Sequence, residues 1–164
     1  MCSSDLTAQI LFLSHDDPQA EISIYINSPG GSISDGLAII DAMRSVPCPV
    51  ATYIVGVAAS MASVIACCGT KGRRFALPHA EHMMHQGRIG GFEGQATDLE
   101  IFTRQMLRIE DVCNRLYSEA TGQTIEKIAA DCDRDLWLTA EEMLAYGLID
   151  RIIDRMPSTA PAAS

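Results

Sequence analysis

The sequence predicts a single mixed α/β domain in which short strands alternate with helices. A chain of 164 residues can bury roughly 70% of the surface that its unfolded form exposes, which is enough for one core. The composition is 48% hydrophobic, yet no apolar run approaches the ~20 residues of a membrane span. Strand-like and helix-like periods alternate over residues 1–155 without a linker or an internal repeat. Residues 156–164 are small and rich in proline, so we expect a disordered tail there.

The first third of the chain is predicted to run helix, strand, helix. Residues 5–14 have a helical pattern, and residues 21–26 alternate polar with apolar side chains, as a strand does. The run Asn27-Ser28-Pro29-Gly30-Gly31 is expected to end this strand. A helix then extends from about Ser34 to Ser45, because two prolines follow it.

The middle of the chain adds strands around another helix. Residues 50–55 are apolar enough for a buried strand. A helix is predicted from near Ala58 to just before Gly69, a residue suited to the left-handed position after a helix end. Two short strands are expected at residues 74–77 and 81–85.

The longest predicted helix covers residues 96–120, where apolar side chains recur at helical spacing and Gly122 follows the end. Residues 139–142, Thr-Ala-Glu-Glu, form a capping-box pattern, which predicts a short helix that ends before Gly147. A last strand is expected at residues 148–153.

Charge and cysteine content narrow the function classes. The net charge of −9 argues against a general affinity for nucleic acid, which requires clusters of Lys and Arg. The N-terminus lacks the basic and apolar segments of a signal peptide, so a cytoplasmic location is expected. The six cysteines include no CxxC pair, and they are predicted to be reduced and mostly buried.

Two glycines that directly follow a predicted strand indicate a possible oxyanion site. Gly30 and Gly31 let backbone N–H groups turn toward a bound carbonyl oxygen. An ordinary turn gives the same pattern, so this motif alone leaves both interpretations open.

Ser60 lies among small residues where a strand is predicted to meet a helix. At a helix N-terminus the first N–H groups are unpaired and the helix dipole is positive, so the Met61 N–H could stabilise an oxyanion. The alternative is that Ser60 only caps or packs the helix. No Gly-x-Ser-x-Gly elbow is present, which disfavours the α/β-hydrolase fold.

A serine nucleophile needs a base, and His85 ends an apolar strand before a glycine-rich loop. The spacing of His79, His82 and His85 also suggests a metal site, but on a strand His82 would point away from the other two, so we predict none. The acidic member of a triad stays open at this point. The candidates include Asp98, Asp111, Asp131, Asp133 and Asp135.

Spaced motifs over residues 6–153 resemble, in order, the proteolytic subunit of the Clp protease family. They are the Pro-Gly-Gly turn, Gly-x-Ala-Ala-Ser-Met with Ser60, Leu77-Pro78, Met84-His85-Gln86, Gly94-Gln95-Ala96-Thr97-Asp98, Thr121-Gly122-Gln123, Asp133-Arg134-Asp135 and Leu138-Thr139-Ala140-Glu141-Glu142. The resemblance implies a serine-type endopeptidase that needs no cofactor or metal and degrades unfolded polypeptides to short peptides.

The resemblance also assigns site residues. It implies the triad Ser60, His85 and Asp135, with the backbone N–H groups of Gly31 and Met61 as oxyanion donors. The resemblance also implies that Gly31, Ser32 and Ile33 bind the substrate. These residues would hydrogen-bond the backbone of an extended polypeptide, with little preference for its sequence.

The family fold is the crotonase-like layered α/β fold with a protruding handle helix, here from Gln95 onward. The resemblance implies two stacked seven-membered rings, with Gln95, Asp133 and Arg134 at the contact between rings, so activity should depend on assembly. An AAA+ unfoldase of the ClpX or ClpA/ClpC type would supply substrates, and neither a nucleic acid nor a membrane is an expected partner.

Two departures from the family leave alternatives open. We expect the family's N-terminal axial loop and first strand to be missing. The family also commonly has a proline after His-Gln, whereas here His85 is followed by the looser run of residues 86–91, Gln-Gly-Arg-Ile-Gly-Gly. A non-catalytic or truncated ring subunit that assembles with an active paralogue is therefore the alternative hypothesis. A crotonase-type acyl-CoA enzyme shares the fold but uses no serine nucleophile.

Overall fold

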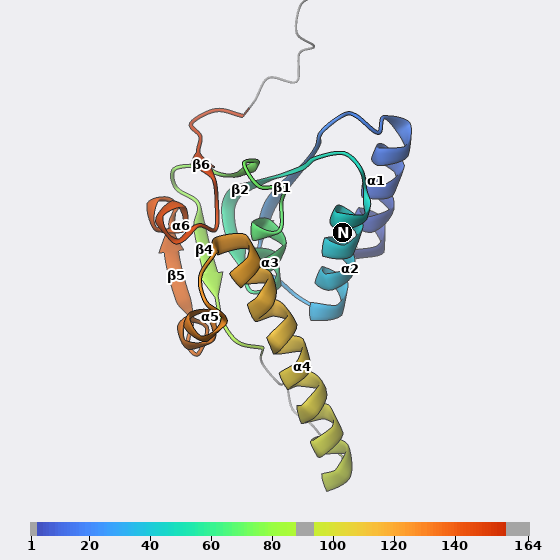
Figure 1. Ribbon diagram of the computed structural model, residues 1–164, viewed down its shortest axis with the longest axis vertical. Coiled ribbons are helices and arrows are strands. Elements are labelled where there is room, and N and C mark those ends of the chain that lie inside the picture. Colours follow the sequence, from blue (N-terminus) through green and yellow to red (C-terminus); the bar gives the residue numbers. More distant parts are fainter. Residues whose placement is uncertain (1–2, 88–93, 157–164) are drawn as a thin grey trace, which may run out of the picture.

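Six helices and six strands are distributed along residues 3–87 and 94–156, the part of the chain that the computed structural model describes (Figure 1). In chain order they are α1 (Ser3–Asp16), β1 (Ile22–Ser28), α2 (Ile33–Ser45), β2 (Val50–Ala59), α3 (Met61–Cys67), β3 (Arg74–Ala76), β4 (Glu81–Met84), α4 (Ala96–Thr121), α5 (Ile125–Asp131), β5 (Leu136–Thr139), α6 (Ala140–Tyr146) and β6 (Arg151–Ile152). The mixed α/β architecture agrees with the prediction.

Strand β2 organises the sheet because it pairs with three other strands. It pairs in parallel with β1 along most of its length, and its first half also pairs with β3 through residues 52–54. Its second half pairs in parallel with β4 through residues 57–59, so β3 and β4 lie end to end beside β2. Strand β6 extends the sheet beyond β3, and β5 runs antiparallel to β4.

The main core lies between the sheet and helices that include α2 and α3. Alternate side chains of β1 point into it, as expected for a strand with one buried face. Its members from β1 and α2 are Ile22, Ile24, Ile26, Ile39, Ile40, Ala42 and Met43. A smaller cluster contains Tyr53 and Phe75, whose rings stack 4.9 Å apart, and the half-exposed Tyr25 stacks on Tyr53.

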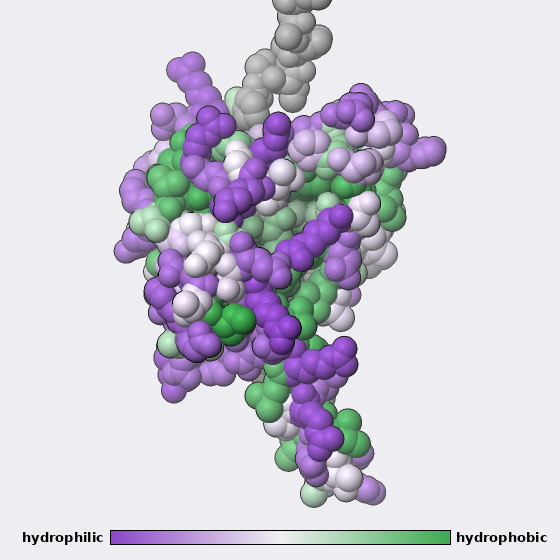
Figure 2. All heavy atoms as spheres, in the orientation of Figure 1, coloured by the Kyte–Doolittle hydropathy of each residue, from purple (hydrophilic) through white to green (hydrophobic). Residues whose placement is uncertain are grey.

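Helix α4 projects from the body of the molecule (Figure 1). Its buried side chains lie in the C-terminal half, which they anchor; they are Asn114, Leu116 and Tyr117. On the projecting half, Ile101 and Leu107 are 63% and 62% exposed, and Figure 2 shows apolar side chains mixed with polar ones along this end. The protruding helix predicted from the resemblance is therefore present.

The prediction placed the boundary between β2 and the next helix too early. It began the helix near Ala58, but the strand continues to Ala59 because its last residues pair with β4. Gly69 does not adopt the left-handed conformation that we expected. A Cβ at this position would lie 2.6 Å from the Thr52 Oγ1, so close packing explains the glycine.

Three further differences concern short elements. Strand β1 continues through Ser28, two residues beyond its predicted end, and β6 covers two residues instead of six. Helix α5 and strand β5 were not predicted, because elements of seven and four residues carry too little periodicity. The capping box of Thr139 and Glu142 is present as predicted. Beyond Met156, the predicted tail lies outside the described residues.

The five cysteines within the described ranges are free thiols, and Cys48, Cys67 and Cys132 are buried as predicted. Burial raises the pKa of Cys132 to about 12, so this thiol stays protonated. Across residues 3–87 and 94–156, no helix is both long and apolar enough to cross a membrane.

Candidate active site

Ser60 stands at a sharp turn between β2 and α3. Its φ of 55° and ψ of −128° make it the one non-glycine residue with positive φ among the described residues. Such a conformation costs about 1–3 kcal/mol and persists only where the surroundings impose it. The Ser60 N–H donates to the Met83 carbonyl of β4 at 2.9 Å, which ties the turn to the sheet.

The glycine turn after β1 packs directly against this serine. Gly30 has a φ of 96°, and a Cβ there would lie 2.6 Å from the Ala59 carbonyl oxygen and 2.7 Å from the Ser60 Cβ. Only glycine allows both the backbone conformation and the close approach. Two segments that sequence reasoning treated as separate motifs therefore form one structure.

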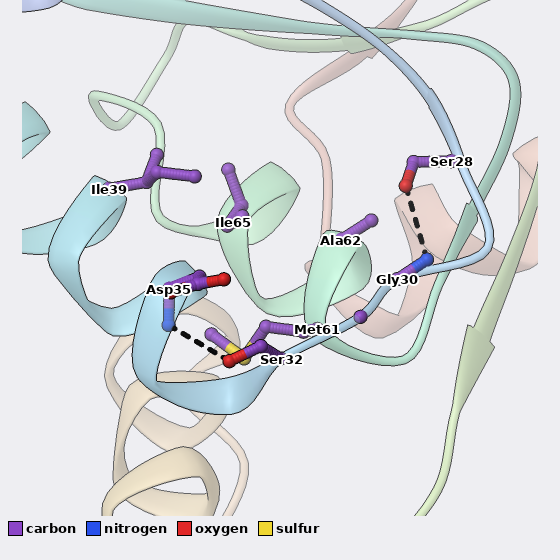
Figure 3. A pocket seen from close by; sticks show the side chains of 10 residues that line it. Ser28, Gly30, Ser32, Asp35, Ile39, Met61, Ala62 and Ile65 are labelled. Atoms are coloured by element: carbon purple, nitrogen blue, oxygen red, sulfur yellow. Dashed lines mark hydrogen bonds between the residues drawn. The ribbon is translucent and has the colours of Figure 1, made fainter. Parts of the chain in front are cut away.

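Two backbone N–H groups next to Ser60 are available to a ligand. Within the described part of the chain, neither the Gly31 N–H nor the Met61 N–H donates a hydrogen bond to another residue. Met61 is the first residue of α3, where N–H groups have no acceptor within the helix. The glycine turn and Met61 line a hollow with a volume of about 300 Å³, and Figure 3 shows the residues around it.

His85 follows the last residue of β4, and its side chain is 11% exposed. It lines a small cavity of about 40 Å³ together with Ser60, Met61 and Tyr117. The imidazole and the serine therefore face one space, as a nucleophile and its base must.

Asp135 reaches His85 because of strand register. Strand β5 runs antiparallel to β4, and Met84 pairs with Leu136, so the next position along each strand brings residue 85 opposite residue 135. The His85 Nδ1 and the Asp135 Oδ1 are 3.8 Å apart, which suits an ion pair but exceeds a hydrogen bond. A carboxylate beside Nδ1 leaves Nε2 as the nitrogen that can serve Ser60.

Gln86 was missed by sequence reasoning, although it fixes the segment that carries Asp135. Its N–H donates to the Cys132 carbonyl at 2.7 Å, and its side-chain amide donates to the Asp133 carbonyl at 3.1 Å. The residue next to the candidate base is thus bonded to the loop that leads to the candidate acid.

His82 lies in the core, with its side chain fully buried beneath the site. Its Nε2 is 3.3 Å from the Ser63 carbonyl oxygen, so Nε2 carries the proton. Burial lowers the pKa of His82 to about 4, and the ring is neutral at pH 7. Among the described residues no group of three or more His, Cys, Asp or Glu side chains is arranged to hold a metal.

Replacing His82 by leucine should reduce the acid sensitivity of the fold. The pKa is lowered from 6.5 to about 4 in the folded state, so as pH falls through this window only the unfolded chain takes up the proton. Stability is therefore fully present above pH 6.5 and falls by about 3 kcal/mol toward pH 4. Urea unfolding from pH 7 to 4 should show a flatter profile for His82→Leu.

The matched control is His79→Gln, which removes an exposed histidine and should leave the wild-type slope unchanged. A profile for His82→Leu as steep as that of the wild type would show that other groups cause the acid sensitivity.

A serine at a strained strand-to-helix turn, an imidazole facing the same cavity and free N–H donors beside them are the features of a serine hydrolase. The family model for Clp protease matches residues 1–156, and the chain belongs to this family. It is 54% identical over 150 residues to the ATP-dependent Clp protease proteolytic subunit 2 of Mycolicibacterium paratuberculosis (strain ATCC BAA-968 / K-10), an alignment that covers 92% of this chain and 75% of that protein.

These matches confirm the predicted family, and the mixed α/β structure with its long projecting helix α4 agrees with the crotonase-like layered fold predicted for it. They also confirm the predicted activity class: the chain is a serine peptidase, a proteolytic subunit of the Clp type. The assignment of individual residues to catalysis stays a prediction, which the geometry above makes specific.

Proposed function

We propose that this chain hydrolyses peptide bonds with Ser60 as nucleophile, His85 as general base and acid, and Asp135 as the group that orients His85. The observation that carries the proposal is the convergence of three segments on Ser60. The strained serine turn, the glycine turn and the cavity lined by His85 come from separate parts of the chain.

The geometry supports the following chemistry. His85 Nε2 takes the Ser60 hydroxyl proton while Oγ attacks the scissile carbonyl carbon, and the acyl-enzyme forms as His85 returns this proton to the leaving amine. The N–H groups of Gly31 and Met61 stabilise the oxyanion. Water then attacks the ester by the same route in reverse.

The substrate backbone is proposed to bind along the residues that follow the glycine turn. Gly31 has a φ of 159° and is therefore extended, and both it and Ser32 are exposed. Ile33 is the first residue of α2, where a backbone N–H has no acceptor within the helix. An extended peptide that bonds the backbone of Gly31, Ser32 and Ile33 would be held by its main chain, so many sequences would be accepted.

Assembly and a partner ATPase are part of the proposal, since the relative is the proteolytic subunit of an ATP-dependent protease. We propose two stacked seven-membered rings, joined through α4 from Gln95 and through Asp133 and Arg134. Both charged side chains are exposed, at 63% and 86%, and the Gln86 bonds give a path from this loop to His85. An AAA+ unfoldase of the ClpX or ClpA/ClpC type would deliver unfolded polypeptides, in the cytoplasm.

The test is reaction with a serine-directed fluorophosphonate, followed by peptide mapping of the label and by light scattering of each labelled fraction. We expect the label on Ser60 and only in ring-sized particles. A label on another serine would refute the catalytic assignment, and labelling of the monomer would refute the dependence on assembly. Labelling that requires a paralogue would instead favour the mixed-ring alternative.

Replacing Asp135 by asparagine should lower kcat for a short fluorogenic peptide by roughly 10³–10⁴-fold, as loss of the triad acid does in serine proteases. The neutral amide neither holds the imidazole tautomer nor stabilises the imidazolium. Glu126→Gln, which removes one carboxylate at the start of α5, is the control and should keep wild-type kcat. Equal kcat values for both variants would remove Asp135 from the triad.

A further inference from the structure

A chain of buried hydrogen bonds lies behind Ser60 and connects it to helix α4. The Ser63 hydroxyl donates to the Ser60 carbonyl oxygen at 2.6 Å, and it also bonds the Tyr117 hydroxyl. The Ser63 side chain is fully buried, and Tyr117 is only 3% exposed. Neither residue has a role in the chemistry described above.

The directions of these bonds follow from proton count. A carbonyl oxygen only accepts, so the single Ser63 hydroxyl proton goes to Ser60, and the Tyr117 hydroxyl must donate to Ser63. Burial raises the pKa of Tyr117 well above 10, so this proton is retained. The result is one directed chain from Tyr117 through Ser63 to Ser60.

Three secondary-structure elements meet in this network. Tyr117 belongs to the anchored half of α4, Ser63 to the first turn of α3, and His82 of β4 donates from Nε2 to the Ser63 carbonyl. The Ser60 carbonyl accepts from the N–H groups of Ser63 and Val64 as well. A positive φ at a serine persists only where its surroundings impose it, and these bonds act on the Ser60 carbonyl while the N–H of the same residue donates to Met83.

We propose that Tyr117 and Ser63 are positioning residues that hold Ser60 in its reactive conformation, so that the seating of α4 on α3 sets the rate of attack. The proposal rests on the proposed function, because it takes Ser60 as the nucleophile. Tyr117 also lines the cavity shared by Ser60 and His85. A shift of the anchored half of α4 would therefore be transmitted to Ser60 through the Ser63 hydroxyl.

The test uses Tyr117→Phe, which removes one oxygen and keeps the ring. We expect kcat for a short peptide to fall roughly 3- to 10-fold, the value of one buried hydrogen bond, with KM unchanged. The rate of fluorophosphonate labelling should fall by the same factor, because this rate measures the reactivity of Ser60 without a peptide-binding step. Rates are compared per assembled particle and below the melting temperature.

Tyr146→Phe is the matched control, because it removes a tyrosine hydroxyl whose partner is Asp131 of α5 and not Ser63 or Ser60. It should keep wild-type kcat and labelling rate. Wild-type rates for assembled Tyr117→Phe, or equal losses in both variants, would overturn the inference. If Ser60→Ala still reacted with the fluorophosphonate, the nucleophile assignment itself would fail, which is a distinct result.

The pair Tyr117→Phe and Ser63→Ala tests whether the two hydroxyls act as one chain. Tyr117 acts on Ser60 only through Ser63, so the double variant should be no slower than Ser63→Ala alone. Losses that multiply in the double variant would show that the two residues act independently and would overturn the proposed chain.

Discussion

Replacing Ser60 by alanine is expected to lower kcat by on the order of 10⁶-fold, as removal of the nucleophile does in serine proteases. The hydroxyl supplies the attacking oxygen, and the residual rate comes only from binding and the oxyanion donors. Peptide cleavage by the purified, assembled variant is the measurement. Ser45→Ala, at a hydroxyl bonded to the Ala42 carbonyl in α2, should retain wild-type kcat.

Two substitutions at Ser60 distinguish its effect on activity from its effect on stability. Alanine keeps the strain of a φ of 55°, whereas glycine adopts this conformation freely. Ser60→Gly should therefore be more stable than Ser60→Ala by about 1 kcal/mol while both are inactive. Unfolding at one protomer concentration measures the difference. Equal stabilities would mean that the turn carries no strain, and a Ser60→Ala protein with wild-type kcat would mean that the nucleophile lies elsewhere.

The assignment of Asp135 as the acid of the triad required information that residue patterns alone did not provide. Residue patterns left several aspartates open because the strand that carries Leu136 was not recognised in four residues. Once β5 is paired with β4, the register places Asp135 opposite His85 without any reference to relatives. The family resemblance had selected the same residue from motif order. Register, a long-range property, was the missing information.

The helix was predicted to begin near Ala58, whereas α3 begins at Met61, and the error is informative. Alanine-rich sequence before Ser60 favours a helix locally, but pairing with β4 keeps Ala58 and Ala59 in the strand. Because the strand continues to Ala59, the backbone changes direction at Ser60. The network of Ser63 and Tyr117 had no sequence signal, because the two residues are 54 positions apart and become neighbours only when α4 packs on α3.

Replacing Gly30 by alanine is expected to lower kcat by roughly 10²–10³-fold, the effect of losing one oxyanion donor. The new methyl group would overlap the Ala59 carbonyl oxygen at 2.6 Å and the Ser60 Cβ at 2.7 Å, and neither is the flexible end of a side chain. Either the glycine turn moves and carries the Gly31 N–H away, or the serine turn moves. Both displacements separate the nucleophile from its oxyanion donors.

Gly72→Ala is the control that distinguishes the effect of steric overlap at Gly30 from the effect of backbone strain. Gly72 has a similar φ of 86°, but a Cβ there would meet nothing within 4 Å. Both variants should lose about 1 kcal/mol of stability through positive φ, and only Gly30→Ala should lose kcat and fluorophosphonate labelling. Wild-type kcat in a folded, assembled Gly30→Ala protein would show that the close approach of the two turns is not required for catalysis, and the oxyanion donors would then have to be sought away from Gly31.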